Sequence, residues 1–476
     1  MKSRFLLALF AFAQLASAQS NLTGHTAPPN ILILLADQWR AQAFGYAGDP
    51  NVHTPRIDAL SRQSVNLRNA ISSVPVCSPM RASLLTGQRA LTHGVFLNDV
   101  PLAQDAACLA KVLGVAGYDT ACVGKWHLNG DGRSAFIPAE RRQGFTYWKV
   151  LECTHSYSNS AYYADTPDKL SWQGYDAFAQ TRDARQYLRA HAKSNRPFLF
   201  ILAWGPPHNP YELAPAEYRA RYDPSKLVLR ANVPKEAEAQ ARRDLAGYYA
   251  HCTALDDCVG DLLQTLSDCG LEKNTIVVFT SDHGDMIGSH GLARKQKPYD
   301  ESIRVPLLIR WPAKLQPREL DAVFSSEDFM PTLLALCNQK IPKTVEGRDY
   351  SALLLAEQST PGTSDLVNSA SLISCPAPFG EWERRNGGKE YRGIRTSRYT
   401  YVRDLNGPWL LFDNQTDPFQ MTNLVRAASS SALANQLDDV LKRKLRHAND
   451  EFLPSAAYIK KWGYITTSGG NVPYTN

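Results

Sequence analysis

Short apolar runs alternate with polar motifs along the chain, and each motif stands directly after a run. The clearest run, residues 31–35, is apolar at every position, which predicts a strand buried on both faces of a parallel sheet. Further strand candidates occupy 119–123, 197–204 and 275–280. Because ligands gather at the carboxyl ends of strands in open α/β sheets, we expect the motifs that follow these four runs to converge on one site.

Segments with helical spacing of apolar residues lie between the runs, over 106–116, 176–192 and 236–266. The last has the length of a long crossover helix. Strands that alternate with helices predict a doubly wound α/β domain, which we place at residues 28–355.

The composition changes after this domain. Gln, Ser, Thr, Pro and Gly dominate 356–365, as is typical of a linker. A helical stretch at 429–452 follows three short β-like segments, which are 391–396, 399–403 and 409–413. We therefore predict a C-terminal subdomain at 366–476, a small antiparallel sheet with one helix.

The first 18 residues resemble a secretory signal peptide. Lys2 and Arg4 precede an apolar run over 5–15, and Ala-Ser-Ala stands before Gln19. That run is too short to span a membrane, and no other uninterrupted apolar stretch approaches about 20 residues. The sequence predicts an exported protein, periplasmic or secreted, without a membrane span.

Composition and charge limit the possible partners. The formal charge of the 476 residues is +6, which could steer anionic substrates, but it is not gathered into Lys/Arg runs that would indicate nucleic acid. Nine cysteines leave eight for disulfides if Cys77 is modified, and their pairing stays open. No C-x-x-C occurs, so a zinc or thioredoxin-like site has no support.

The most specific motif surrounds Cys77. Cys-x-Pro-x-Arg followed by Leu-Leu-Thr-Gly, over 77–87, resembles the signature of the sulfatase family. In that family a maturation enzyme oxidises the cysteine to Cα-formylglycine. Taken alone, Cys77 also fits an ordinary buried cysteine or half of a disulfide.

A hydrated aldehyde at Cys77 would supply a nucleophile with its own release step. One of its two hydroxyls attacks sulfur, the bond from sulfur to the substrate oxygen breaks and releases the alcohol, and a covalent sulfate ester forms. Loss of the proton of the second hydroxyl expels sulfate and regenerates the aldehyde.

Five motifs together occur in the order and approximate spacing of type I, formylglycine-dependent sulfatases of the alkaline phosphatase superfamily. They are Asp37-Gln38, the Cys77 signature, the Gly-Lys-Trp-His motif at 124–127, His208 and the Asp-His-Gly motif at 282–284. The resemblance covers nearly all of the chain after the signal peptide. It implies an alkaline-phosphatase-like fold, a large mixed and mostly parallel sheet between helices, with one Ca²⁺ per site.

The resemblance implies a metal shell of Asp37, Gln38, Asp282 and His283, completed by an oxygen of modified Cys77. Oxygen ligands suit Ca²⁺, with Mg²⁺ or Mn²⁺ as alternatives. The chain departs from many members, which have a second Asp at Gln38 and Asn at His283. A single Asp after a strand also fits turn capping.

The remaining roles follow the same resemblance. Arg81 would hold the hydrated formylglycine, Lys125 would contact sulfate, and His127 would bond the formylglycine hydroxyl and take its proton. His208 would face the leaving-group oxygen. Lys295 aligns with the second sulfate-binding lysine, although Lys297 competes for that place. Asn98 and His93 could line the pocket or serve the structure only.

An insertion at 148–172 has little periodicity, as binding loops often do, and its aromatic residues could stack on a sugar or anchor packing. We expect a Ca²⁺-dependent sulfatase that hydrolyses sulfate monoesters on a carbohydrate after a formylglycine-generating enzyme has acted. One alternative is a phosphonate monoester or phosphodiester hydrolase of the same superfamily. Another is a non-catalytic glycan-binding protein, which predicts that Cys77 stays unmodified.

Overall fold

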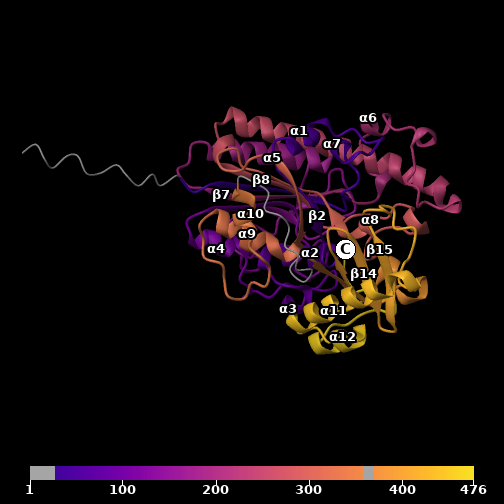
Figure 1. Ribbon diagram of the computed structural model, residues 1–476. Helices are drawn as coiled ribbons and strands as arrows, with labels where there is room; N and C mark the ends of the chain where they lie inside the picture. Colours follow the sequence, from indigo (N-terminus) through magenta and orange to yellow (C-terminus); the bar gives the residue numbers. More distant parts are fainter. Residues whose placement is uncertain (1–26, 357–368, 476) are drawn as a thin grey trace, which may run out of the picture.

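The computed structural model describes residues 27–356 and 369–475 (Figure 1). The predicted signal peptide at 1–18 and most of the predicted linker lie outside the described residues. Among the residues that are described, no helix has both the length and the apolar character needed to cross a bilayer.

A large mixed sheet forms the centre of the molecule, with strand order β11-β2-β10-β8-β1-β7-β3-β4 and β9 beside β2. The strands are β1 Asn30–Asp37, β2 Val65–Ile71, β3 Asp119–Lys125, β4 Tyr147–Leu151, β7 Phe198–Pro207, β8 Thr275–Ser281, β9 Arg304–Val305, β10 Leu307–Arg310 and β11 Arg318–Ser325. β10 is antiparallel to both of its neighbours, and β9 is antiparallel to β2. The other pairings in this sheet are parallel.

The four predicted strands are confirmed as β1, β3, β7 and β8, and they stand next to one another in the order β8-β1-β7-β3. All of their mutual pairings are parallel, so their carboxyl ends share one edge of the sheet. The motifs after the four strands are thereby brought to one place.

Side chains of β1 alternate between two hydrophobic cores. Ile31, Ile33 and Leu35 pack into one core, whereas Leu32 and Leu34 pack into the other. Helices cover both cores, as the unbroken apolar pattern of β1 predicted (Figure 1). On the first side lie α2 Cys77–Thr86, α4 Leu109–Val115 and α9 Phe329–Leu336, and on the second lie α1 Pro55–Ser61, α5 Asp176–His191 and α7 Glu238–Asp268.

Shorter elements complete the main part of the chain. They are α3 Ala90–His93, α6 Ala216–Arg219, α8 Asp300–Ile303, α10 Ser351–Leu355 and the two-stranded sheet of β5 Ala161–Tyr162 with β6 Leu170–Ser171. The sequence predicted no strands within the insertion, yet β4 covers its first residues, and β5 and β6 are too short to show a period.

A second, antiparallel sheet lies in the C-terminal part, as predicted. Its strands are β12 Ser371–Cys375, β13 Tyr391–Arg395, β14 Tyr399–Asp404 and β15 Gly407–Asp413. One face packs against Ile71 and Ile303 of the main body, and the other packs against α11 Ser431–His447.

The C-terminal part differs from the prediction in its helices. The predicted helical stretch ends at His447 instead of 452, and a further helix, α12 Ser455–Trp462, follows it. Asn449 and Phe452 have φ values of 50° and 53°, a left-handed conformation that cannot continue an α-helix. The chain between His447 and Ser455 therefore separates α11 from α12.

Candidate active site

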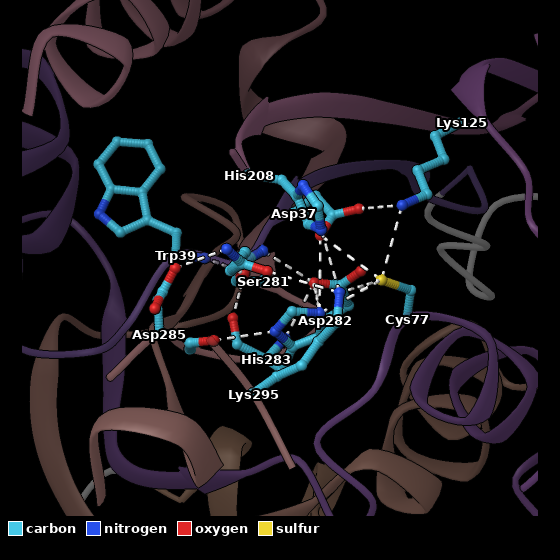
Figure 2. A network of polar contacts seen from close by, with 12 residues as sticks. Asp37, Trp39, Cys77, Lys125, His208, Ser281, Asp282, His283, Asp285 and Lys295 are labelled. Atoms are coloured by element: carbon cyan, nitrogen blue, oxygen red, sulfur yellow. Dashed lines mark hydrogen bonds and ion pairs between the residues drawn. The ribbon is translucent and has the colours of Figure 1, made fainter. Parts of the chain in front are cut away.

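The carboxyl ends of β1 and β8 bring two acidic side chains together. Asp37 is the last residue of β1, and Asp282 follows the last residue of β8. One carboxylate oxygen of each lies within 4.8 Å of His283 Nε2 and Cys77 Sγ, and all four atoms lie within that distance of one another. These residues are almost completely buried and form the centre of a polar network (Figure 2).

Cys77 is the first residue of α2, directly after Val76 in extended conformation. Its Sγ lies 3.2 Å from Lys295 Nζ, 3.3 Å from His283 Nε2 and 3.5 Å from Lys125 Nζ. Burial acts to raise the pKa of the Cys77 thiol, but these three cationic or ionisable groups lower it well below its ordinary value. The position therefore favours a negatively charged group.

Arg81 stands one turn after Cys77 on α2. Its Nη2 donates to Asp282 Oδ2 over 2.9 Å and to Asp37 Oδ2 over 3.3 Å, and Nη1 donates to the Lys125 carbonyl over 2.9 Å. The guanidinium thus bridges the carboxylates of two neighbouring strands. Its predicted contact with modified Cys77 stays a prediction.

The two carboxyl groups have opposite pKa shifts. Burial and Cys77 act to raise the pKa of Asp37, but Lys125 and Arg81 outweigh them and hold it well below its ordinary value. Burial and the neighbouring charge of Asp37 raise the pKa of Asp282, against the effect of Arg81.

Lys125 ends β3 and points its ammonium group at the same centre. Its Nζ donates to Asp37 Oδ2 over 2.6 Å, in addition to its contact with Cys77. The side chain is 7% exposed, so water screens this charge only weakly. The motif placed after the second predicted strand therefore reaches the site.

His127 is held by an acidic residue that the sequence analysis missed. Its Nε2 lies 3.2 Å from Asp99 Oδ1, and Arg133 binds both oxygens of Asp99 at 2.9 and 2.8 Å. Burial acts to lower the pKa of His127, but the charge of Cys153 and the bond to Asp99 raise it to about 9. Asp99 directly follows Asn98, which the sequence analysis named as a possible pocket residue. This neighbour was the signal that could have identified Asp99.

His208 and Lys295 form a pair at the end of β7. Lys295 Nζ lies 3.0 Å from His208 Nε2, and His208 Nδ1 lies 2.7 Å from the carbonyl oxygen of Asn209. Since a carbonyl only accepts, Nδ1 carries the proton and Nε2 accepts from the ammonium group. Burial and Lys295 lower the pKa of His208 well below its ordinary value, so the ring is neutral in this arrangement.

The two candidate lysines point in different directions. Lys295 lies 3.2 Å from Cys77, whereas Lys297 donates to the carbonyl of Ala293 over 2.6 Å and lies 5.0 Å from the ring centre of Trp382. Burial lowers the pKa of Lys297 to about 8. The structure therefore brings Lys295, and not Lys297, to Cys77.

Two other residues support the helix that carries Cys77. Asn98 Oδ1 accepts the backbone N–H of Ser78 over 3.1 Å, and His93 Nε2 lies 3.0 Å from Ser83 Oγ. Both contacts hold α2 in place. A substrate contact through Asn98 stays a prediction.

Two further residues lie at this edge: His155 from the insertion that the sequence predicted as a possible binding loop, and Asp285, which the sequence analysis missed. His155, from the insertion, stacks on His208 with ring centres 5.0 Å apart and planes 8° apart. Asp285 accepts the Gln38 side-chain amide over 2.5 Å. We call the central group the Cys77 cluster, defined as Asp37, Gln38, Cys77, Arg81, Lys125, His208, Asp282, His283 and Lys295.

Comparisons with known proteins identify relatives of the whole chain. A family model described as Sulfatase matches residues 29–339, and one described as N-sulphoglucosamine sulphohydrolase, C-terminal, matches 288–447. The chain is 45% identical to an ulvan-active sulfatase of Formosa agariphila, over 92% of this chain and 85% of that protein. It is 31% identical to an endo-4-O-sulfatase of Bacteroides thetaiotaomicron, over 88% of this chain and 92% of that protein. A solved structure from work on glycosaminoglycan metabolism by that organism superposes with a TM-score of 0.81 at 29% identity, covering 94% and 100% of the two chains.

Proposed function

The chain belongs to the sulfatase family and is a sulfuric ester hydrolase with the alkaline-phosphatase-like fold, and from this premise we propose how it acts and on what. The proposed reaction is hydrolysis of sulfate monoesters on a carbohydrate, with Cys77 matured to Cα-formylglycine and one Ca²⁺ beside it. The observation that carries the proposal is the position of Cys77 Sγ, within 3.7 Å of two lysines, His283 and Asp37.

The donor set fits a divalent cation. His283 Nδ1 lies 2.9 Å from the Gly284 carbonyl, which leaves Nε2 directed at Asp37 Oδ1 and Asp282 Oδ1, each 3.6 Å away. Burial and the charge of Asp37 raise the pKa of Asp282, so a cation bound here would stabilise its charged form. We assign Asp37, Gln38, Asp282 and His283 as ligands, and a bound Ca²⁺ would orient the sulfate and stabilise negative charge on the nucleophile.

Lys125 and Lys295 would bind the sulfate oxygens. Their ammonium groups flank Cys77, Lys125 from the end of β3 and Lys295 from the segment between β8 and α8, and both side chains are largely buried. Charges held in place where water is excluded stabilise developing negative charge strongly, because they need no reorganisation during the reaction. Arg81 would keep the two carboxylates in position through its bonds to Asp37 and Asp282.

His127 would exchange a proton with the group at Cys77. Its Nε2 is occupied by Asp99, and its Nδ1 has no hydrogen-bond partner among the described residues. Because the raised pKa keeps the ring protonated, Nδ1 is the atom that can give a proton and take it back. The Asp99–Arg133 pair holds the ring in the orientation that leaves Nδ1 available.

His208 would protonate the leaving-group oxygen. Its pKa is low while the Lys295 ammonium group is its main neighbour. A sulfate ester bound to Lys295 would place negative charge beside the ring and raise that pKa, which is the condition for His208 to act as an acid.

The carbohydrate substrate is inferred from relatives. The ulvan-active sulfatase and the endo-4-O-sulfatase both match most of the chain. His155, exposed and stacked on His208, extends the insertion toward the same end of the site, where a sugar ring would lie. We also propose that residues 1–18 direct export and that 28–355 and 366–476 form the catalytic domain and the C-terminal subdomain.

The proposal is tested by producing the chain together with a formylglycine-generating enzyme. The mass of the peptide that contains Cys77 reports conversion to the aldehyde, and a panel of defined sulfated mono- and oligosaccharides reports sulfate release with and without a chelator. We expect conversion, sulfate release and loss of activity on chelation. A larger kcat/KM for phosphate diesters or phosphonate monoesters would favour the alternative hydrolase, and an unmodified Cys77 without turnover would favour a glycan-binding protein.

A further inference from the structure

Asp285 is a completely buried carboxylate that lies at the side of the network away from Cys77 (Figure 2). Its Oδ1 accepts the backbone N–H groups of Ile287 and Arg294 over 3.1 and 2.9 Å. Its Oδ2 accepts the Gln38 side-chain amide over 2.5 Å and the Tyr211 hydroxyl. Both oxygens therefore act only as acceptors, and two of the donors are backbone groups that cannot turn away.

Gln38 faces Asp285 with one end of its amide and the Cys77 cluster with the other. Nε2 donates to Asp285 and, over 3.3 Å, to Asn209 Oδ1. Oε1 lies 3.5 Å from Lys295 Nζ, whose ammonium group also contacts Cys77. The backbone N–H of Gln38 donates to Asp282 Oδ1 over 3.0 Å, which fixes the residue beside the proposed metal ligands.

An amide ligand has a requirement that a carboxylate does not have. A carboxylate offers an oxygen in either orientation of its terminal group, whereas an amide offers oxygen in one orientation and N–H in the other. Gln38 can present Oε1 to a cation only while an acceptor holds Nε2 on the opposite side. Asp285 is the nearest such acceptor.

We infer that Asp285 is a positioning residue that locks the Gln38 amide with its oxygen toward the proposed metal site, and that residues 38 and 285 therefore act as a pair. The inference rests on the proposed function, because it takes Gln38 as a ligand of the cation. The Tyr211 hydroxyl reinforces the lock: Arg294 Nη1 donates to it over 2.5 Å, so its own proton goes to Asp285.

Replacement of Asp285 by Asn separates this role from a purely structural one. The oxygen of the introduced amide must remain toward the N–H groups of Ile287 and Arg294, because an NH₂ group there would face two donors. The NH₂ group of the introduced amide then faces the NH₂ group of Gln38, and two donors cannot form a hydrogen bond with each other. The Gln38 amide must turn and direct its own NH₂ at the cation site.

The experiment measures CaCl₂ binding by calorimetry on chelator-treated, matured protein, for the parent, Asp285→Asn, Gln38→Glu and the double variant. We expect Asp285→Asn to weaken Ca²⁺ binding by about 10- to 100-fold, as the loss of a group that orients a metal ligand does. In the double variant the introduced carboxylate at position 38 accepts from the introduced amide at position 285 and presents its second oxygen to the cation. Gln38→Glu should therefore improve Ca²⁺ affinity at least about tenfold more in the Asp285→Asn background than in the parent background.

Asp256→Asn is the matched control. Asp256 is a buried carboxylate that also accepts two backbone N–H groups, from Arg56 and Ile57, and it lies outside the Cys77 cluster. We expect Asp256→Asn to change the melting temperature and to leave the Ca²⁺ affinity within about twofold, within the scatter of such measurements.

The inference is overturned if Asp285→Asn folds and binds Ca²⁺ as the parent does, or if Gln38→Glu has the same effect in both backgrounds. If Asp285→Asn alone does not fold, a folded double variant that binds Ca²⁺ supports the pairing, and a double variant that also fails to fold overturns it. A parent that neither binds Ca²⁺ nor releases sulfate contradicts the proposed function itself. An active parent with an Asp285→Asn variant that binds Ca²⁺ equally well contradicts only the role of Asp285.

Discussion

Two groups of buried charge differ in how their members are paired. At the junction between the main body and the C-terminal sheet, Asp300 of α8 accepts two hydrogen bonds of 2.9 Å from Arg395 of β13, and Arg304 Nη1 lies 3.2 Å from the same carboxylate. Neither arginine has a second carboxylate partner among the described residues, so we call Asp300 and Arg395 a closed pair. In the Cys77 cluster, the carboxylate of Asp37 is shared by Lys125 and Arg81. The cations of that cluster are likewise shared, since Arg81 also binds Asp282.

The pKa shifts show what this difference does. Burial acts to raise the pKa of Asp300, but Arg395 and Arg304 lower it to about 2, so the pair stays charged. In the Cys77 cluster, burial and neighbouring charges lower the pKa of His208 well below its ordinary value and raise that of Asp282. A closed pair holds its groups in one charge state. In the Cys77 cluster, the charge states of His208 and Asp282 can still change when an anion and a cation bind.

The largest effect should follow removal of a charge from the closed pair. Asp300→Asn leaves the Arg395 guanidinium buried without its counter-ion, and loss of one partner of a buried pair costs about 3–5 kcal/mol of unfolding free energy. Denaturant unfolding measures this loss. At a temperature where the variant is folded, kcat should stay close to that of the parent. A large fall in kcat of the folded variant would show that the closed pair also affects turnover, and so that the two regions are not separate in function.

Removal of one cation from the Cys77 cluster should lower turnover and leave stability nearly unchanged. We expect Lys295→Met to lower kcat/KM by about 10²–10³, since one donor to developing negative charge is worth about 3–4 kcal/mol, while the unfolding free energy changes little. Lys297→Met is the matched control, because Lys297 is also buried but directed at Trp382. Steady-state kinetics of sulfate release measures both, and equal losses in the two variants would contradict the assignment of Lys295.

The pH dependence of stability sharpens the comparison at Asp300. Its pKa is about 2 in the folded protein, below its ordinary value of 3.8, so the pair contributes stability above the ordinary pKa and loses it as the pH falls toward the folded value. The contribution lost is about 2 kcal/mol. The difference in unfolding free energy between the parent and Asp300→Asn should shrink by this amount over that window. A difference that does not change with pH would show that the pair is not charged as described.

The smallest effect is expected for an exposed pair. Arg68 lies 2.6 Å from Asp321, and about half of each side chain or more is exposed. Arg68→Ala should lower the unfolding free energy by less than about 1 kcal/mol, because water screens the attraction. Denaturant unfolding in low and high salt checks this value. A loss as large as that of Asp300→Asn would mean that burial is not what separates strong from weak pairs.

The sequence predicted those strands of the sheet best whose residues are apolar without a break. Unbroken apolar runs identified β1, β7 and β8, because such runs fit strands covered on both faces. The antiparallel direction of β10 was not predicted, since strand direction depends on the path of the chain and not on the residues of a four-residue strand. The alternating Ser and apolar residues of β12 likewise gave no clear signal.

The strand-end motifs also predicted which residues would meet, but not how they would be oriented. Gln38 and His127 have φ values of 68° and 63°, a left-handed conformation that non-glycine residues rarely adopt. Their side chains contact Asp285 and Asp99, and no pattern in the sequence reveals this conformation. The roles of the cluster residues stay predictions until variants are measured.

The account depends most on Cys77 as the precursor of the nucleophile. The direct measurement is sulfate release from a defined sulfated oligosaccharide by Cys77→Ala, produced with a formylglycine-generating enzyme and compared with the parent. We predict no release above the uncatalysed rate, with the circular dichroism spectrum of the parent retained. Sulfate release by Cys77→Ala at a rate near that of the parent would contradict the account.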